Sequence, residues 1–424
     1  MIEQAVISAG GQGTRMSGLF FDLPKLLHKI GDKSVLEHSL AVLDQTGIKR
    51  IHLLLGMLAE PIIAVLPELS EKYGVVFSYK VEEEPLGTGG SLLNSLNELQ
   101  NEFILLYGDL FINSDLSQLV QGLNQEDVDF AQLVHPTNHP EDSDLLQLDF
   151  ENRIIRYLLK PHKSDLVFNN IANSGVYAFK KNTLLSRTRE LEIGKIDLDR
   201  ELLPYLVSEG MKGKAIRNYG YVRDVGTPQR FEAVNADYIS GKTKLKRRPA
   251  IFLDRDGTLN ESNGYITKAE QLTIFKDVAP FIAKANKLGF LVFLVTNQPV
   301  IARGDASFMD ISAIHAKLET NVAKYGGYFD SIFVCPHHPD SGFLGELIDL
   351  KKECPCRKPE IGMFTEAISL FAVDTTQSIM IGDTDIDQEF AHRANIRFTR
   401  IVRNSEFKVP GCISSLEEVV LEIE

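Results

Sequence analysis

The chain has 424 residues, of which 44% are hydrophobic and 24% charged, and it carries a formal net charge of −13. Single cores usually stop growing at about 250–300 residues, so this length predicts two domains of ordinary soluble composition. The acidic balance argues against nucleic acid or an anionic membrane as the main partner. It does not exclude phosphorylated small molecules, because local cations set the field at a site.

The N-terminus predicts no targeting segment. Met1 to Gln4 lead directly into an apolar strand, without the basic stretch and long apolar run of a signal peptide. A run of about 18 apolar residues is also missing, so we expect no membrane span. Three of the four cysteines lie between positions 335 and 356, together with His337. In a reducing compartment this spacing favours metal ligation over disulfides, and we expect a cytoplasmic protein.

Short apolar strands alternate with amphipathic helices in both halves of the chain, which is typical of α/β layers with mainly parallel sheets. The expected strands are 5–8, 51–55, 103–107, 176–179, 250–253, 290–295, 331–334 and 378–381, and the expected helices are 35–46, 280–288 and 311–324. The basic stretch 240–249 favours a solvated linker over a nucleic-acid patch. The predicted fold is therefore two doubly wound, Rossmann-like α/β domains, at 1–240 and 249–424, joined by a linker at 241–248.

A glycine-rich loop follows the first expected strand directly. Glycines let the backbone approach a triphosphate and point N–H groups at it. Arg15 can chelate phosphate oxygens with two hydrogen bonds, and Lys25 can supply a point charge. Such a loop alone is a weak signal, because many strand–helix turns contain glycine. The remaining candidates in the loop are Gly10, Gly11, Gly13 and Thr14.

Four further turns follow in order. They are Glu82–Gly90, Gly108-Asp109, Asn173-Ser174-Gly175 and Asp224–Pro228. Asp109 follows an apolar strand, which places its carboxylate at the edge of a sheet where α/β proteins bind ligands. Asp109 and Asp224 together can hold Mg²⁺ against a triphosphate.

With their order and spacing, these motifs make residues 1–240 resemble the sugar-1-phosphate nucleotidyltransferase family. The resemblance implies that Arg15 and Lys25 contact the phosphates of the nucleotide and the sugar. It also implies that Asp109 and Asp224 hold Mg²⁺. Further substrate-binding residues implied by the motifs are Gly10, Gly11, Gly13, Thr14, Glu84, Gly87, Asn173 and Gly175.

Two finer features bear on the substrate. Lys160 matches a lysine that contacts the sugar phosphate in this family, but the residue before it is Leu159, where the family usually has a glutamate. That departure leaves the sugar open. The run Glu83-Glu84-Pro85 resembles guanylyltransferases, and a carboxylate can accept from guanine N1–H and N2–H₂ together. We therefore expect GTP as the nucleotide, the alternative being that the three successive acids form only a solvated loop.

The second half contains Asp254 and Asp256 immediately after a buried strand. Asp254 can attack phosphorus, and Asp256 can protonate the leaving oxygen and later activate water. Mg²⁺ lets a carboxylate approach a phosphate dianion without prohibitive repulsion. The helper residues follow in order: Thr296 and Asn297 for phosphate oxygens, Arg357 and Lys358 for positive charge, and Asp383 as a further Mg²⁺ ligand beside Asp254 and Asp256.

These motifs make residues 249–424 resemble the haloacid dehalogenase superfamily, closest to its heptose-bisphosphate and histidinol-phosphate phosphatases with a minimal cap. Three thiolates and one imidazole form a closed tetrahedral set suited to structural Zn²⁺. The expected ligands are Cys335, His337, Cys354 and Cys356. His338 competes for the imidazole position, although the spacing in the family favours His337. Cys412 is expected to be a small buried hydrophobe.

Some features of this half depart from the family pattern. Pro299-Val300 follows Thr-Asn-Gln, and the loop between His337 and Cys354 is long. The segment 260–265 favours the heptose-bisphosphate branch, whereas 382–387 favours the histidinol-phosphate branch. These features bear on the choice of leaving group and not on the phosphatase chemistry.

The two resemblances imply consecutive steps. The phosphatase would remove the 7-phosphate of D-glycero-D-manno-heptose 1,7-bisphosphate, and the nucleotidyltransferase would activate the remaining 1-phosphate for surface-glycan synthesis. One alternative is another sugar 1-phosphate combined with a histidinol-phosphate-type phosphatase. Another is a non-catalytic sugar-nucleotide sensor regulating the phosphatase. The expected partners are small molecules, NTP and sugar phosphates, with no nucleic acid and no membrane, and a homo-oligomer is left open.

Overall fold

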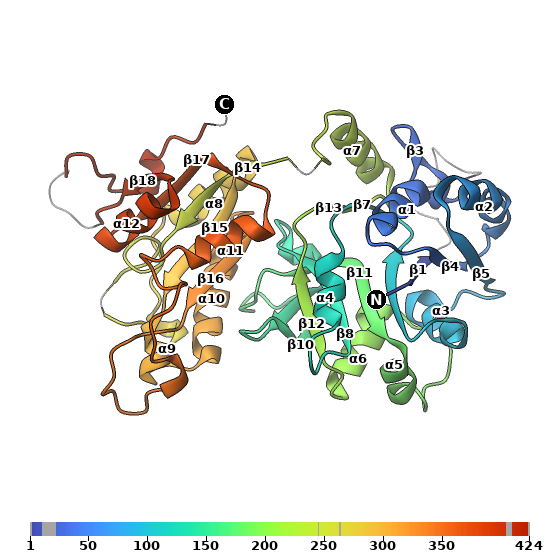
Figure 1. Ribbon diagram of the computed structural model, residues 1–424, viewed down its shortest axis with the longest axis horizontal. Helices are drawn as coiled ribbons and strands as arrows, with labels where there is room; N and C mark the ends of the chain where they lie inside the picture. The colour runs from blue at the N-terminus through green and yellow to red at the C-terminus, as the bar shows by residue number, and fades with distance from the viewer. Residues whose placement is uncertain (1, 11–22, 245, 263, 404–408, 423–424) are drawn as a thin grey trace. The chain divides into compact units, whose positions relative to one another are not determined.

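The computed structural model describes residues 2–10, 23–244, 246–262, 264–403 and 409–422 (Figure 1). Its contacts divide the chain into two compact units. The first unit comprises 1–135, 151–159 and 173–245, and the second comprises 136–150, 160–172 and 246–424. The change of unit at 245–246 falls inside the stretch expected as a linker, whereas 136–150 and 160–172 were expected in the first domain.

The first unit is mixed α/β. Its strands are β1 (Gln4–Ala9), β2 (Lys29–Ile30), β3 (Lys33–Ser34), β4 (Arg50–Leu55), β5 (Val76–Val81), β6 (Glu102–Tyr107), β7 (Leu110–Asn113), β8 (Phe130–His135), β10 (Arg153–Leu158), β11 (Ala172–Lys180), β12 (Gly213–Arg217) and β13 (Tyr221–Asp224). Its helices are α1 (Val35–Gln45), α2 (Ala59–Tyr73), α3 (Gly87–Ser95), α4 (Ser117–Leu123), α5 (Lys181–Arg187), α6 (Leu203–Ser208) and α7 (Pro228–Ile239).

The main sheet of this unit has the strand order β5-β4-β1-β6-β11-β8-β12-β10. Strands β5, β4, β1 and β6 are parallel to one another, whereas β11 runs antiparallel to β6. In β1, Ala5, Val6 and Ile7 are completely buried, as expected for a central strand covered on both faces. The carboxyl ends of β1 and β6 therefore meet at one edge of the sheet, and this places Gly10 near Gly108-Asp109.

Local signals explain where the flanking helices begin. Ser34 and Glu37 form a reciprocal capping box at the start of α1, with Ser34 N donating to Glu37 Oε2 at 2.8 Å. Thr227 caps α7, and Pro228 occupies its first position, where a missing N–H costs no helical hydrogen bond. The cap of α7 follows Asp224 closely, so the cap also fixes the turn that carries that carboxylate.

The second unit is built on a five-stranded sheet with the order β16-β15-β14-β17-β18, in which every neighbouring pair is parallel. The strands of this sheet are β14 (Arg248–Leu253), β15 (Leu291–Asn297), β16 (Ser331–Cys335), β17 (Val373–Gly382) and β18 (Arg397–Arg400). Strand β9 (Leu145–Leu148) falls in the second contact unit but does not belong to this sheet. The helices of this unit are α8 (Val278–Leu288), α9 (Pro299–Arg303), α10 (Phe308–Ala323), α11 (Gly362–Leu370) and α12 (Asp385–Ala394).

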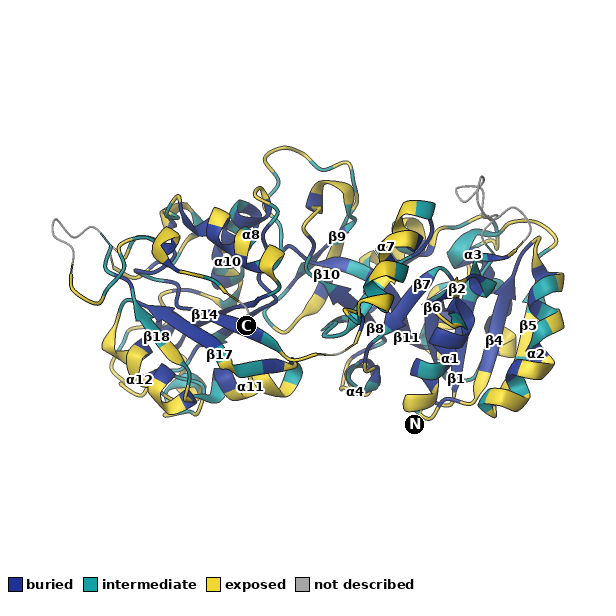
Figure 2. Ribbon diagram, turned by 90° about the horizontal axis from the view of Figure 1, so that it is seen from above, coloured by how far each residue is buried: buried dark blue, intermediate teal, exposed yellow. Residues whose placement is uncertain are grey.

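The register of this sheet brings the predicted motifs to one edge. Leu253 at the end of β14 pairs with Leu294 of β15 and Ile381 of β17, and Asn297 pairs with Cys335. Figure 2 shows β14 and β17 buried, while α12 carries exposed residues on its outer side. The residues that follow these strands therefore gather at the carboxyl edge of the sheet.

The expected strands and helices are confirmed, with ends that differ by a few residues. The largest difference is β17, which begins at Val373 rather than at 378. Across the described ranges, none of the helices combines the length and apolar character that a membrane crossing requires.

Candidate active sites

The first cluster of predicted residues surrounds Gly226. Strand β13 pairs with β7 so that Asp224 lies opposite Leu110, and Val225 N donates to Asp109 O at 2.8 Å. A Cβ built on Gly226 would lie 2.7 Å from Asp224 Oδ1, 3.2 Å from Asp109 Oδ2 and 3.4 Å from Lys25 Nζ. The structure therefore brings Lys25, Asp109 and Asp224 together, and a side chain at position 226 would push the ends of their side chains aside.

The two neighbouring carboxylates of this cluster suit a bound cation. Burial raises the pKa of Asp109, and the negative charge of Asp224 raises it further, against the opposing effect of Lys25. Lys25 Nζ lies 3.6 Å from Asp109 Oδ2, and Arg230 NH1 lies 2.5 Å from Asp224 Oδ2. Two carboxylates this close repel each other, so a divalent cation between them would relieve the repulsion. Sequence reasoning missed Arg230, although its place in the first turn of α7 was a usable signal.

The nucleotide loop is described only in part. Gly11, Gly13, Thr14 and Arg15 lie outside the described residues. Gly10 is described, and a Cβ on it would lie 3.3 Å from Glu82 Oε2. A Cβ on Gly56 would lie 2.6 Å from Gly10 O, so the backbone at Gly56 passes close to the backbone at Gly10.

The turn that follows β5 contains the three acids. Glu82 accepts from Leu86 N at 3.2 Å and from the Ser91 hydroxyl, so its carboxylate supports the turn. Glu84 is exposed. Gly87 has φ +70°, and a Cβ there would lie 2.6 Å from Ile196 O, which explains why glycine begins α3.

Asn173 and Gly175 lie at the start of β11 in a network of tyrosines. Asn173 Oδ1 accepts from Gly175 N at 2.8 Å, and Asn173 Nδ2 donates to Tyr177 Oη at 2.5 Å. Tyr177 and Tyr107 both donate to the carboxylate of Asp199, the latter at 2.7 Å. Asp199 therefore holds the tyrosines that orient Asn173, and no sequence motif includes Asp199.

Lys160 falls in the second contact unit. Its Nζ lies 2.9 Å from Asp142 Oδ1, and its backbone N donates to Asp144 Oδ1 at 2.8 Å. The preceding Leu159 is 36% exposed.

The second cluster is centred on Lys358. This buried lysine donates to Asp254 Oδ1 and to Asp387 Oδ1, each at 2.6 Å. The pKa of Asp254 is raised to about 7, chiefly by burial and also by the charges of Asp387 and Asp256, against the opposing charge of Lys358. A cation near these carboxylates would favour their ionised form.

Asp383 completes a group of three carboxylates. Ligand atoms of Asp254, Asp383 and Asp387 lie within 4.8 Å of one another, and a Cβ on Gly257 would lie 2.1 Å from Asp383 Oδ2. Asp383 Oδ1 is buried and has no hydrogen-bond partner among the described residues, and burial followed by the charge of Asp387 raises the Asp383 pKa to about 6. An orphaned buried oxygen beside two other carboxylates fits a hard divalent cation.

This group differs from the predicted magnesium set. The group of carboxylates in the structure contains Asp387, whereas the expected set contained Asp256, and which of them hold Mg²⁺ stays a prediction. Thr384 caps α12, and its hydroxyl donates to Asp387 Oδ2 at 2.6 Å, which turns Asp387 toward the sheet edge. The motif Gly-Asp-Thr-Asp-Ile-Asp contained this capping signal, which sequence reasoning did not use.

The Asp256 carboxylate is instead held by N–H donors. Arg255 donates to both of its oxygens, and Asn260 Nδ2 and Gln298 Nε2 each donate at 3.0 Å. Burial acts to raise the pKa of Asp256, but the charge and hydrogen bonds of Arg255 outweigh it, and the pKa is lowered. The carboxylate is therefore ionised at neutral pH.

The remaining predicted helper residues lie at the same edge. Thr296 is buried, and its hydroxyl accepts from Gln298 Nε2 at 2.8 Å. Asn297 donates to Lys358 O at 3.0 Å and accepts from Lys358 N at 2.9 Å, so it anchors the loop that carries the lysine. Arg357 NH1 donates to His337 O at 3.2 Å, which ties it to the cysteine loop.

The cysteine loop brings together the four expected zinc ligands. The Sγ atoms of Cys335, Cys354 and Cys356 lie 3.2–3.5 Å apart, and His337 Nδ1 lies 3.2 Å from Cys356 Sγ. The hydrogen bond with Cys335 lowers the pKa of Cys356 to about 5, although burial acts to raise it. His338 instead accepts from Asp340 N and contacts Arg303 NH2 at 3.2 Å, so it does not join this group.

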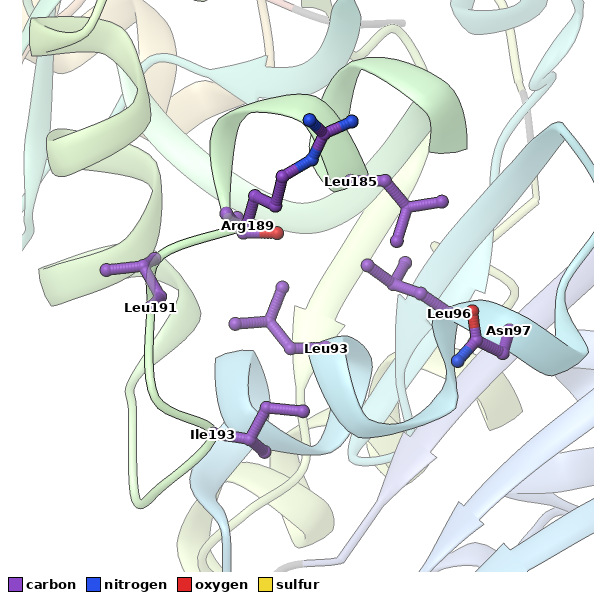
Figure 3. Close-up of a pocket in the computed structure, with 8 residues that line it drawn as sticks. Leu93, Leu96, Asn97, Leu185, Arg189, Leu191 and Ile193 are labelled. Carbon is purple, nitrogen blue, oxygen red and sulfur yellow. The ribbon is translucent and has the colours of Figure 1, made fainter.

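Two cavities differ in their position relative to these clusters. The larger, of about 410 Å³, lies in the first unit and is lined mainly by apolar side chains, including Leu93, Leu96, Leu185 and Ile193, with Arg189 near its edge (Figure 3). None of the predicted site residues that the structure describes lines it, and we assign it no role in catalysis. The second, of about 350 Å³, has Asp383 in its wall and therefore adjoins the phosphatase cluster.

Comparison with known proteins supports two enzymatic parts. The family model for nucleotidyl transferases matches residues 4–241, and a HAD-hydrolase-like model matches 355–405. A D-glycero-beta-D-manno-heptose-1,7-bisphosphate 7-phosphatase from Vibrio cholerae is 36% identical over 159 residues, 38% of this chain and 83% of the relative. The corresponding protein of Haemophilus influenzae is 36% identical over 173 residues, 41% of this chain and 91% of the relative.

Among solved structures, a putative glucose-1-phosphate thymidylyltransferase from Bacillus anthracis matches with a TM-score of 0.50 and 20% identity. The match covers 56% of this chain and 94% of that one, and it supports the nucleotidyltransferase fold.

Fold, clusters and relatives together define a mixed α/β enzyme with two phosphate-handling parts. The chain belongs to the nucleotidyl transferase family through residues 4–241 and, through its second part, to the haloacid-dehalogenase-type phosphatases that these relatives represent. Both resemblances inferred from the sequence are confirmed, and the chain is an enzyme with nucleotidyltransferase and phosphatase activities.

Proposed function

We propose that the chain carries out two consecutive steps in making a nucleotide-activated heptose. The second part removes the 7-phosphate of D-glycero-D-manno-heptose 1,7-bisphosphate, and the first part, residues 1–240, transfers GMP from GTP to the heptose 1-phosphate. The observation that carries this proposal is the buried Asp254–Lys358–Asp387 contact, in a chain of which 159 residues are 36% identical to a heptose-bisphosphate phosphatase. The expected domain limits, 1–240 and 249–424, are part of the proposal.

The phosphatase step follows from the positions of the two aspartates. Asp254 attacks phosphorus, a bond forms from its carboxylate oxygen, and the bond from phosphorus to the sugar oxygen breaks. Asp256 gives a proton to that oxygen, then takes one from the water that hydrolyses the phosphoaspartate. Mg²⁺ held by Asp254, Asp383 and Asp387 would neutralise charge as the carboxylate meets the phosphate.

Two features of the cluster favour this order of events. Lys358 already contacts Asp254 at 2.6 Å, so its positive charge can stabilise the negative charge that develops on the phosphoryl oxygens. Asp256 is ionised before substrate binds, and the negative charge of an incoming phosphate raises its pKa, which favours uptake of the proton that it later donates. Thr296 and Arg357 are proposed to contact the phosphate.

In the nucleotidyl transfer, an oxygen of the sugar 1-phosphate attacks the α-phosphorus of GTP, and pyrophosphate leaves. Lys25 and Arg15 are proposed to neutralise the reacting phosphates, with Gly10 allowing close backbone approach. Mg²⁺ held by Asp109 and Asp224 would stabilise the departing pyrophosphate. Lys160, Asn173 and Gly175 are proposed sugar-phosphate contacts.

The direct test of the proposed function uses the purified full chain. We expect phosphate release from heptose 1,7-bisphosphate to exceed release from histidinol phosphate by at least about tenfold in kcat/KM. A preference for histidinol phosphate would defeat the heptose proposal and leave the phosphatase chemistry intact.

Guanine selection predicts a clear order among nucleotides. With heptose 1-phosphate as acceptor, pyrophosphate release is expected to be roughly tenfold or more faster with GTP than with UTP, dTTP, CTP or ATP. The exposed Glu84 is the proposed acceptor for guanine, because Glu82 is engaged by the turn. E84Q should therefore reduce the preference for GTP, whereas E83Q, which alters an exposed neighbour, should retain it. A preference of the wild-type chain for UTP contradicts this assignment.

The cysteine loop is proposed to hold one structural Zn²⁺. Three thiolates and one imidazole leave no open position, so the metal shapes the loop that carries Arg357 and Lys358. We expect about one zinc per chain by elemental analysis of the purified protein, with C354S losing the metal and most of the phosphatase activity. C412S is the matched control, since Cys412 lies outside the group, and it should retain both. Zinc content unchanged in C354S would exclude this site.

A further inference from the structure

Arg255 lies between the two aspartates in the sequence and is fully buried. Its Nε donates to Asp256 Oδ1 at 3.1 Å, and its NH2 donates to Asp256 Oδ2 at 2.8 Å. This two-point contact fixes both the position and the plane of the carboxylate.

Gln298 extends this arrangement. It accepts from Arg255 NH2 at 3.0 Å and donates to Asp256 Oδ2 at 3.0 Å. The same amide also donates to Thr296 Oγ1 at 2.8 Å, which links it to the end of β15. Asp256 is therefore held in place by groups from two neighbouring strands.

The far side of Arg255 is supported by His315 of α10, a residue that no motif includes. Arg255 NH1 lies 3.3 Å from His315 Nε2, and the histidine is 5% exposed. Because an arginine can only donate, Nε2 must accept, which requires a neutral ring. Burial and then the Arg255 charge lower the pKa of His315 to about 3, in agreement with that state.

Without the His315 ring, one N–H of the buried Arg255 guanidinium would lose its hydrogen-bond partner. Leaving a charged buried donor unsatisfied is costly, and the side chain would shift to regain a partner. Any shift of Arg255 moves Asp256, because two of its hydrogen bonds hold that carboxylate.

We propose that His315 is a positioning residue for the phosphatase reaction: by accepting from Arg255, it holds Asp256 in line with the oxygen of the leaving group. His315 itself touches no substrate. The inference rests on the proposed roles of Asp254 and Asp256, and it does not depend on which sugar phosphate is the substrate.

The leaving group separates this role from a merely structural one. A sugar alkoxide leaves only with a proton, whereas p-nitrophenolate leaves without one. Since kcat/KM reports the first irreversible step, displacement of Asp256 should lower kcat/KM for the sugar phosphate selectively. General acid catalysis contributes roughly 10²–10⁴-fold, and partial misplacement should remove about tenfold of it.

The experiment compares the full-length wild type with H315L and H315Q, using heptose 1,7-bisphosphate and p-nitrophenyl phosphate. H315L is expected to lose about tenfold in kcat/KM for the bisphosphate and to stay within about twofold for p-nitrophenyl phosphate. H315Q keeps an acceptor near the same position and should restore most of the loss. Pyrophosphate release by the other part serves as the check on intact protein, and H315N replaces H315L if the latter does not fold.

Equal losses on both substrates, or no loss on either, would overturn the positioning role. Failure of H315Q to recover any activity that H315L loses would overturn it as well. If the wild type hydrolyses neither substrate, the proposed phosphatase function fails instead, so the two failures are distinguishable.

Discussion

Replacing Asp254 by asparagine is expected to abolish phosphate release while leaving nucleotidyl transfer intact. The amide has nearly the same shape as the carboxylate, but it cannot form the acyl phosphate on which the two-step route depends. Losing the nucleophile should lower kcat for heptose 1,7-bisphosphate by on the order of 10⁴-fold or more. Phosphate release and pyrophosphate release, measured on the same preparation, give the two readouts.

The matched control for this variant is D385N. Asp385 lies at the start of α12, close to the cluster in sequence, but its side chain is 94% exposed and pairs with Arg400. An exposed pair of this kind contributes little, so activity should remain within about twofold of the wild type. If D254N retained more than a tenth of the activity, another group would have to be the nucleophile.

The positions of Asp254, Asn297 and Asp383 could be predicted because parallel strands determine them. Each follows or ends a strand of the same sheet, and the carboxyl ends of such strands lie at one edge. The order of the strands in the sheet does not have to be known to predict that these residues lie at the same edge. An apolar run followed by a polar residue is enough, and for this reason the phosphatase cluster was recognisable in the sequence.

Side-chain direction was the part that the sequence did not reveal. Asp256 and Asp387 were both visible as acids near the expected site, yet their roles depend on local hydrogen bonds. The capping box at Thr384 turns Asp387 toward Lys358, while Arg255 turns Asp256 into a separate set of donors. A pattern of charged residues carries no information on which neighbour each carboxylate will meet.

Arg255 and His315 illustrate a second limit. A charged residue in a turn is usually exposed, so the sequence favours a surface position for Arg255. Its burial depends on acceptors contributed by residues 43 and 60 positions away, Gln298 and His315. Such long-range compensation is invisible to motif analysis, whereas in the folded chain it identifies the positioning residues of the site.

Replacing Asp109 by asparagine is the corresponding test of the first cluster. Asp109 lies beside Asp224 and Lys25 at the end of β6, and the pKa of its buried carboxyl is raised chiefly by burial and then by Asp224. Removing one of two carboxylates weakens the proposed hold on Mg²⁺, so GTP-dependent pyrophosphate release should fall by on the order of 10²–10³-fold. Phosphate release by the second part should be unchanged.

The control for D109N is D127N in the same unit. Asp127 pairs with Lys212 at 3.0 Å, and both side chains are more than half exposed, so this variant should stay within about twofold of the wild type. Pyrophosphate release that is unaffected by D109N would remove Asp109 from the reaction. Loss of phosphate release in D109N, with transfer intact, would instead favour a regulatory first part. Because the two assays share one preparation, a general folding defect would lower both together and would be recognised as such.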